Sequence, residues 1–205
     1  TGGVQNHHVA FSGGTAESNY RASVAYTGRE TVIHHIGYNN FVAKLDLTQM
    51  AFDNHLTIDF GIFGSSQNSR NISDPQALFY AAASQNPTLS PAWNGSGWTV
   101  NPTANQIAAP QARLRVKDEV VNQNLNSHLS LKVRLLPELS FKLFGSYTFT
   151  STENAQFSPT WTAAQAMAAR REEKHKDWLL NASLNYDKTL GVHHLTAQLL
   201  GEYQE

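Results

Sequence analysis

The feature that most constrains this chain is a pair of long alternating segments between Asn122 and Thr150. A period of two is typical of a β-strand, because successive side chains leave a strand on opposite faces. Each segment provides the roughly 9–11 residues with which a strand crosses a bilayer, whereas soluble strands usually have about 5–6. The pattern predicts a hairpin of an outer-membrane barrel, with one face toward lipid and one toward the lumen. The apolar positions are Leu125, Leu129, Leu131, Val133 and Leu135 before Leu136-Pro137-Glu138, and Leu139, Phe141, Leu143, Tyr147 and Phe149 after it.

Composition excludes several classes of protein. No run in the 205 residues approaches the roughly 18 continuous apolar residues of a membrane helix, so a helical membrane protein is excluded. The mean hydropathy of -0.40 still allows a membrane barrel, because alternating polar residues lower the average. The formal net charge of -1 gives no long-range field for nucleic acid. Because the chain has no cysteine, disulfides and thiolate metal sites are excluded.

The rest of the chain repeats the same two-sided pattern, and we predict an all-β antiparallel meander of about eight long strands. The connections after the first, third, fifth and seventh strands are short, and those after the second, fourth and sixth are long. Bacterial outer-membrane barrels show this asymmetry, with short periplasmic turns and longer extracellular loops. The predicted strands lie at about residues 7–14, 20–27, 38–49, 56–64, 122–136, 139–150, 177–186 and 195–203. Aromatic residues near strand ends suggest interfacial girdles: Tyr20, Tyr26, Tyr147, Phe149, Trp178, Tyr186 and Tyr203.

Two long loops, residues 65–118 and 151–174, interrupt the alternation. In the first, Asp74 before Pro75 predicts a short capped helix that runs to Ala83. In the second, Thr162–Glu173 is rich in Ala and predicts a helical turn or two, with Arg170-Arg171-Glu172-Glu173-Lys174 as its exposed end. We predict that loop aromatics contact a ligand or a partner protein, although they could instead pack the loops onto themselves. These candidates are Phe79, Tyr80, Trp93, Trp98 and Trp161.

Three pairs of adjacent histidines suggest a metal site, since imidazole is a common metal ligand. Adjacent residues of a strand point to opposite faces, so the pairs within strands cannot chelate one ion, and we expect no metal and no cofactor. The pairs are His7-His8, His34-His35 and His193-His194. Asp46 and Asp59 share the polar face and resemble the paired carboxylates of a glycoside hydrolase. Four cations share that face, which favours a solvated lumen over an enzyme site: Arg21, Lys44, Lys132 and Arg134.

Several short motifs in order along the chain resemble the SusC/RagA-like TonB-dependent transporters. They are Ser12-Gly13-Gly14, Ser18-Asn19-Tyr20-Arg21-Ala22-Ser23, Leu45-Asp46-Leu47, Leu56-Thr57-Ile58-Asp59, Ala83-Ser84-Gln85-Asn86-Pro87-Thr88 and Leu195-Thr196-Ala197-Gln198-Leu199-Leu200-Gly201-Glu202-Tyr203. The resemblance implies a large transmembrane β-barrel in the bacterial outer membrane, with short helices in extracellular loops. It also implies import of a glycan or peptide substrate, a SusD-like surface lipoprotein as lid, and a TonB complex that acts through a plug.

The chain starts at Thr1-Gly2-Gly3 and contains no segment that reads as a signal peptide or plug. We therefore expect residues 1–205 to be a partial barrel domain, cut from a protein of the roughly 22 strands expected for such transporters. Two alternatives remain from the sequence. One is a complete eight-stranded barrel that acts as an anchor or adhesin. The other is a soluble carbohydrate-binding β-sandwich, which the loop tryptophans favour and the strand lengths do not.

Overall fold

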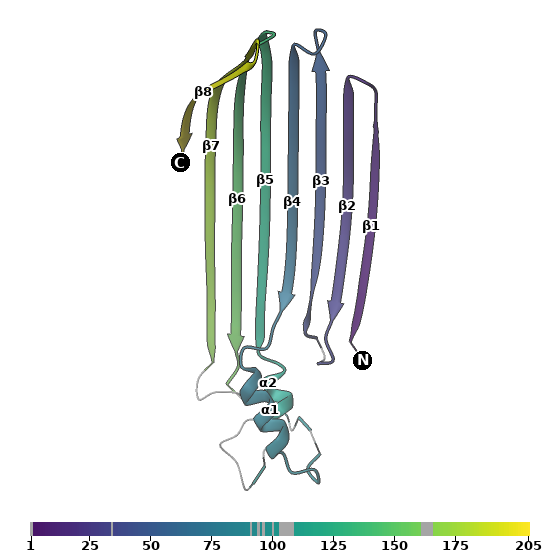
Figure 1. The fold of residues 1–205 in the computed structure, drawn as a ribbon. Coiled ribbons are helices and arrows are strands. Elements are labelled where there is room, and N and C mark those ends of the chain that lie inside the picture. Colours follow the sequence, from purple (N-terminus) through teal and green to yellow (C-terminus); the bar gives the residue numbers. More distant parts are fainter. Residues whose placement is uncertain are drawn as a thin grey trace.

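The computed structural model contains one antiparallel sheet with two short helices at one end (Figure 1). It describes residues 2–33, 35–90, 92–93, 95, 97–99, 101–102, 109–160 and 166–205. The strands are β1 (Gly3–Gly14), β2 (Ser18–Glu30), β3 (Gly37–Ala51), β4 (Leu56–Arg70), β5 (Lys117–Leu136), β6 (Leu139–Ser158), β7 (Met167–Leu190) and β8 (His193–Gln204). The helices, α1 (Pro75–Ser84) and α2 (Pro110–Arg113), both lie between β4 and β5.

Each strand pairs with its neighbour in the chain, in the order β1-β2-β3-β4-β5-β6-β7-β8. This confirms the predicted meander. Short turns join β1 to β2, β3 to β4, β5 to β6 and β7 to β8 at one end of the sheet, and the longer connections and both helices lie at the other (Figure 1). The predicted segregation of short turns from long loops is therefore confirmed.

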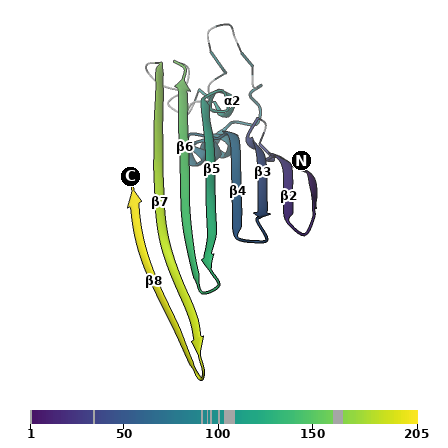
Figure 2. The same cartoon turned by 90° about the horizontal axis from the view of Figure 1, so that it is seen from above.

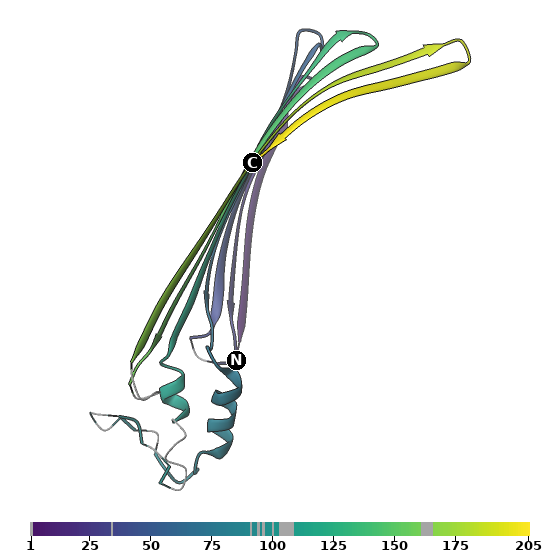
Figure 3. The ribbon, with the colours of Figure 1, turned by 90° about the vertical axis from the view of Figure 1, so that its left-hand side faces the viewer.

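The sheet is a single open layer. β1 and β8 form its two opposite edges (Figure 2) and do not pair with each other. Seen from the side, the sheet is one twisted layer with the helices beyond the loop end (Figure 3). A closed eight-stranded barrel would need β1 to pair with β8, and a sandwich would need a second sheet. Neither alternative from the sequence fits the described strands.

The predicted helix at Thr162–Glu173 is wrong for the residues that the structure describes there. Residues 167–173 belong to β7, and the connection between β6 and β7 spans only residues 159–166. The charged run Arg170–Lys174 suits a strand, because residues two apart lie on the same face of a strand and here carry opposite charges. Arg171 pairs with Glu173 at 3.3 Å, and Lys174 pairs with Glu172 at 2.7 Å. Arg170 also reaches Glu153 on β6 at 2.9 Å.

The first long loop is shorter than predicted, because β4 continues to Arg70 and β5 begins at Lys117. Within it, α1 matches the predicted helix closely. The Asp74 carboxylate accepts a hydrogen bond from the Ala77 amide at 2.9 Å, and Pro75 occupies the first helical turn. Both features satisfy the start of a helix, where backbone amides lack partners within the helix. No helix in the described part of the chain has the length and apolar character needed to cross a bilayer.

Candidate functional site

The strand register places the predicted apolar and polar sets on opposite faces of the sheet. Leu131 lies opposite Leu143, and Val133 lies opposite Phe141. Lys132, between them in sequence, lies opposite Lys142. Because paired residues of an antiparallel sheet share a face, this separation extends across all eight strands. We call the two sides the apolar face and the polar face.

The apolar face carries a belt of mostly apolar side chains, seven to nine residues tall on β2 to β8, in which Ser127 on β5 is a polar member. Its members are Val9 and Phe11 on β1, Tyr20–Tyr26 on β2, Phe41–Leu47 on β3, Leu56–Gly64 on β4, Leu125–Val133 on β5, Phe141–Phe149 on β6, Trp178–Tyr186 on β7 and Leu195–Tyr203 on β8, taking alternate residues of each range. At about 3.3 Å per residue, a nine-residue strand segment is about 26 Å long, which is the length that crosses a bilayer.

Aromatic residues mark both margins of the belt. Tyr26, Phe149 and Trp178 lie at the margin nearer the loops, and Tyr20 and Tyr186 at the margin nearer the turns. All the aromatic residues predicted from the sequence as girdle members are on the apolar face. Rings at such margins anchor a barrel at the two interfaces of a bilayer. The rings of Tyr147 and Trp178 pack together with their centroids 4.3 Å apart.

The belt runs obliquely across the strands. From Tyr203 on β8, the row of paired residues passes through Leu180, Gly145, Leu129, Phe60 and Leu47 to Tyr20 on β2. Tyr203 is at the loop margin, whereas the loop margin of β2 is Tyr26, six residues from Tyr20. The loop margin of the belt therefore shifts by about 20 Å along the strands between β8 and β2. These strands are six inter-strand spacings apart, or about 29 Å, so the shift corresponds to a strand tilt of about 35°. Membrane barrels have tilts of about 35–45°.

The belt is not covered by any described part of the chain. Phe11 is 66% exposed and Leu199 is 72% exposed. The buried apolar residues of the described chain are Leu78, Ala81, Ala109 and Ala112, and all lie in or beside the two helices. A sheet whose apolar face is exposed over most of its strands requires an apolar partner. The height, tilt and aromatic margins of this belt fit a bilayer as that partner.

The loop helices present two of the predicted contact residues to solvent. Leu78 and Ala81 of α1 are buried, as is Ala112 of α2, where the two helices pack together. Phe79 and Tyr80, on the other side of α1, are 60% and 63% exposed. The structure therefore makes these two aromatic side chains available to a partner, although it does not test whether they bind one.

Trp93 and Trp98 lie together in a small bridged turn of the same loop. Their backbones form an isolated antiparallel bridge, and their rings pack edge to face with centroids 5.6 Å apart. The guanidinium of Arg115 lies 5.8 Å from the Trp98 ring. The Trp98 indole nitrogen is buried, which indicates that Trp98 packs inside the loop, whereas Trp93 is 46% exposed. The fifth predicted contact residue, Trp161, lies outside the described residues.

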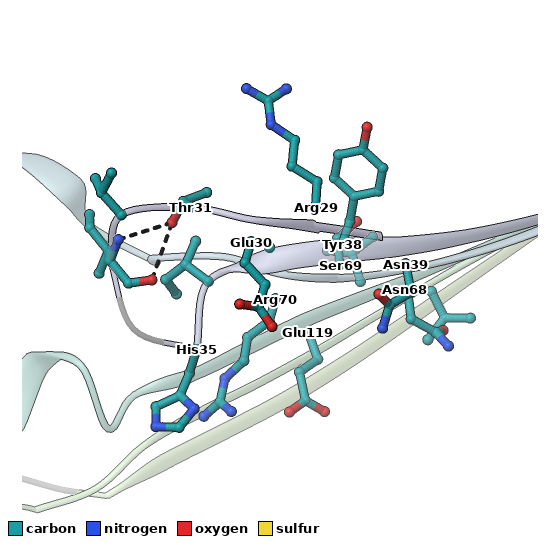
Figure 4. A pocket seen from close by; sticks show the side chains of 16 residues that line it. Arg29, Glu30, Thr31, His35, Tyr38, Asn39, Asn68, Ser69, Arg70 and Glu119 are labelled. Atoms are coloured by element: carbon teal, nitrogen blue, oxygen red, sulfur yellow. Dashed lines mark hydrogen bonds between the residues drawn. The ribbon is translucent and has the colours of Figure 1, made fainter. Parts of the chain in front are cut away.

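A hollow of about 670 Å³ at the loop end of β2 to β5 was not predicted. Its wall includes residues 31–33, 35 and 36 of the connection after β2, and Glu30, Arg70 and Glu119 point to the same side as His35 (Figure 4). In the register, Arg70 lies opposite Gly37 and Glu119. Gly37 is needed there, because a Cβ would meet the carbonyl of Arg29. The charged residues were visible in the sequence, but the pairing that gathers them spans four strands.

The predicted histidine and carboxylate arrangements have ordinary structural partners where the structure describes them. Described residues include no group of three side chains suited to hold a metal ion. His7 stacks against Tyr26, and His194 contacts the Asp187 carboxylate at 2.9 Å. Asp46 and Asp59 lie on the polar face, as predicted. Asp46 pairs with Lys44 at 3.0 Å, and Asp59 accepts a hydrogen bond from Thr48 at 2.9 Å.

Comparison with known proteins identifies relatives of this sheet. No protein-family model matches the chain. The TonB-dependent receptor SusC of Bacteroides thetaiotaomicron is 24% identical over 159 residues, which covers 65% of this chain and 16% of SusC. The RagAB peptide importer in its closed-closed state superimposes with a TM-score of 0.72 at 16% identity, over 97% of this chain and 24% of that chain. A second structure of the RagAB peptide transporter gives a TM-score of 0.71 over 98% of this chain and 24% of that one.

Proposed function

We propose that this chain, which is a segment of the SusC/RagA-like type of TonB-dependent transporter in sequence and fold, forms part of the wall and outer loops of an outer-membrane nutrient importer. The observation that carries the proposal is the exposed apolar belt, with a tilt and aromatic margins suited to a bilayer. The chain spans about a quarter or less of the relatives it matches. In this proposal residues 1–205 are a partial barrel domain, and the whole protein is a transporter rather than an enzyme.

In this proposal the apolar face contacts outer-membrane lipid, and the polar face lines the lumen. The four short turns lie in the periplasm, and the helices with their long loop lie outside the cell, as in barrels with this loop asymmetry. The partners are a SusD-like surface lipoprotein that acts as a lid, a TonB complex that acts through the plug, and a glycan or peptide as substrate. Proteins place recognition on loops held by a rigid scaffold, so we assign lid or substrate contact to Phe79, Tyr80 and Trp93.

The test replaces exposed loop aromatics in the full-length protein. Trp93→Ala and Tyr80→Ala should reduce uptake or co-purification of the lid lipoprotein while the amount of folded barrel in the outer membrane stays constant. Trp98→Ala should act differently, because it removes a packed ring and so changes the shape of the loop. Trp178→Ala is the contrasting control, since Trp178 is also exposed but lies in the belt and packs on Tyr147; it should change the amount of folded barrel and not the association with the lid.

Two results would contradict this assignment. In the first, Trp93→Ala and Tyr80→Ala both transport and hold the lid as the parent does. In the second, a cysteine introduced on the exposed side of α1, such as Tyr80→Cys, is labelled by a membrane-impermeant reagent only after the outer membrane is broken. The second result would place the loop in the periplasm and invert the proposed orientation.

A further inference from the structure

The polar face contains a cluster of cations that the sheet itself does not neutralise. Lys132 on β5 lies directly opposite Lys142 on β6, and Arg134 lies opposite Ser140, one step farther along the same face. Like charges directly opposite each other destabilise a pair of strands. Within the described chain, no carboxylate lies within ion-pair distance of any of the three. We call Lys132 and Lys142 the lysine pair.

The nearest acidic residue in the register does not serve as the missing partner. Asp59 lies opposite Ser130, diagonal to Lys132. Its carboxylate accepts a hydrogen bond from the Thr48 hydroxyl on the other side of β4 at 2.9 Å. The Lys142 ammonium lies 5.8 Å from the Phe144 ring, which provides a weak cation–π contact and no counter-charge.

The lysine pair opens into a hollow of about 560 Å³ on the polar face. Besides the two lysines and Asp59, its wall consists of hydroxyl and amide side chains and one leucine: Ser130, Ser140, Asn181, Ser183, Asn185, Gln198 and Leu200. Ser130 and Ser183 are each only 6% exposed and are the most buried residues of this wall. Two ammonium groups beside hydroxyl and amide donors are the chemistry that binds an oxyanion.

We propose that the lysine pair, with Arg134 beside it, is a carboxylate-binding site. This inference rests on the proposed function in one respect, which is that the polar face lines the lumen. A carboxylate there accepts hydrogen bonds from both ammonium groups, and the guanidinium of Arg134 is suited to bidentate pairing with a second carboxylate. The carboxylate is supplied either by an acidic side chain of polypeptide lying in the lumen or by a solute. The two sources share one chemistry and are distinguished by experiment.

Zero-length carbodiimide coupling of the full-length protein in outer-membrane vesicles tests the site directly. The reagent joins an ammonium group to a carboxylate in contact with it, and peptide mass spectrometry identifies the products. Lys44 is the internal positive control, because its ammonium lies 3.0 Å from the Asp46 carboxylate. Lys176 is the negative control, because it is exposed and has no carboxylate within ion-pair distance in the described chain.

A polypeptide source predicts a link from Lys132 or Lys142 to an acidic residue outside this sheet, at a yield comparable to that of Lys44. A solute source predicts instead that added isotope-labelled succinate couples to the lysine pair and not to Lys176. Coupling at the level of Lys176 in both arms overturns the proposal. A link to Asp59 alone also overturns it, because the sheet would then neutralise itself.

The sign of a stability change provides a second, independent measurement. If the two lysines only repel each other, Lys132→Gln and Lys142→Gln each remove that repulsion and stabilise the barrel. If a carboxylate occupies the site, each variant leaves that carboxylate less compensated, and the urea midpoint of the full-length barrel falls. Lys176→Gln should leave the midpoint unchanged. Neither measurement depends on uptake, so failed transport with the links intact would contradict the proposed function alone.

Discussion

The depth of the belt can be tested with a single arginine placed at three positions of β5. Leu129 lies in the middle of the belt segment Leu125–Val133, opposite Phe60 and Gly145, and is 44% exposed. Each margin is four residues away, which is about 13 Å along the strand and about 11 Å in height at a tilt of about 35°. Leu129 therefore lies near the midplane of a band of about 25 Å.

Leu129→Arg should destabilise the folded barrel by about 2–4 kcal/mol, the cost of a cation facing lipid at the midplane. This corresponds to a loss of about 30-fold to about 700-fold in the folding equilibrium. Leu125→Arg, at the loop margin, should cost about 0–1 kcal/mol. Asn126→Arg is the control on the polar face, where Asn126 is exposed and its side-chain amide donates a hydrogen bond to Thr148 at 3.2 Å.

The measurement is urea-dependent folding of the full-length protein into phospholipid vesicles, followed by the gel mobility of the folded form. The expected order of destabilisation is Leu129→Arg, then Leu125→Arg and Asn126→Arg with small effects. Equal losses at Leu129 and Asn126 would show that the two faces have the same environment. A larger loss at Leu125 than at Leu129 would place the bilayer at a different height.

Two further predictions concern groups outside the belt. Asp74→Ala should cost about 1 kcal/mol of local helix stability, seen as faster amide exchange in α1, while Asp74→Asn should retain most of the protection; unchanged exchange in both would contradict the capping role. The pKa of the Glu172 carboxyl lies below its ordinary value, chiefly because Lys174 donates a hydrogen bond to it. Lys174→Gln should therefore raise that pKa toward the ordinary range in an NMR titration, and a pKa that does not change would exclude Lys174 as the cause.

The sequence predicted the sheet well within the belt, where one face of each strand is apolar and the other is polar. There apolar and polar residues alternate, so Leu131 and Lys132 fall on opposite faces and the pairing follows. Beyond the belt, both faces carry polar residues and the alternation is lost. For this reason the outer part of β6 (Ser151–Ser158) and the charged start of β7 (Met167–Lys176) did not look like strands in the sequence.

The candidate site was predicted less completely, because its geometry depends on pairing between distant residues. The Asp74 cap is local, so the sequence predicted it correctly. That Trp98 is packed inward while Trp93 is exposed depends on the bridge between them. The opposition of Lys132 and Lys142 depends on the register of the β5–β6 hairpin, which a turn containing a bulge near Leu135 helps to set.

The long connection between β4 and β5 has a consequence for the order of assembly. Every other pair of adjacent strands is joined by a turn or short loop, whereas residues 71–116 separate β4 from β5. Closing this connection costs about 2 kcal/mol more than closing a turn of about four residues, at about 0.6 kcal/mol for each doubling of length. The two halves, β1–β4 and β5–β8, can therefore pair their strands separately, and we expect the pairing of β4 with β5 to form last. The packing of α1 on α2 shortens the part of this connection that must be closed, so the two helices should help β4 to pair with β5.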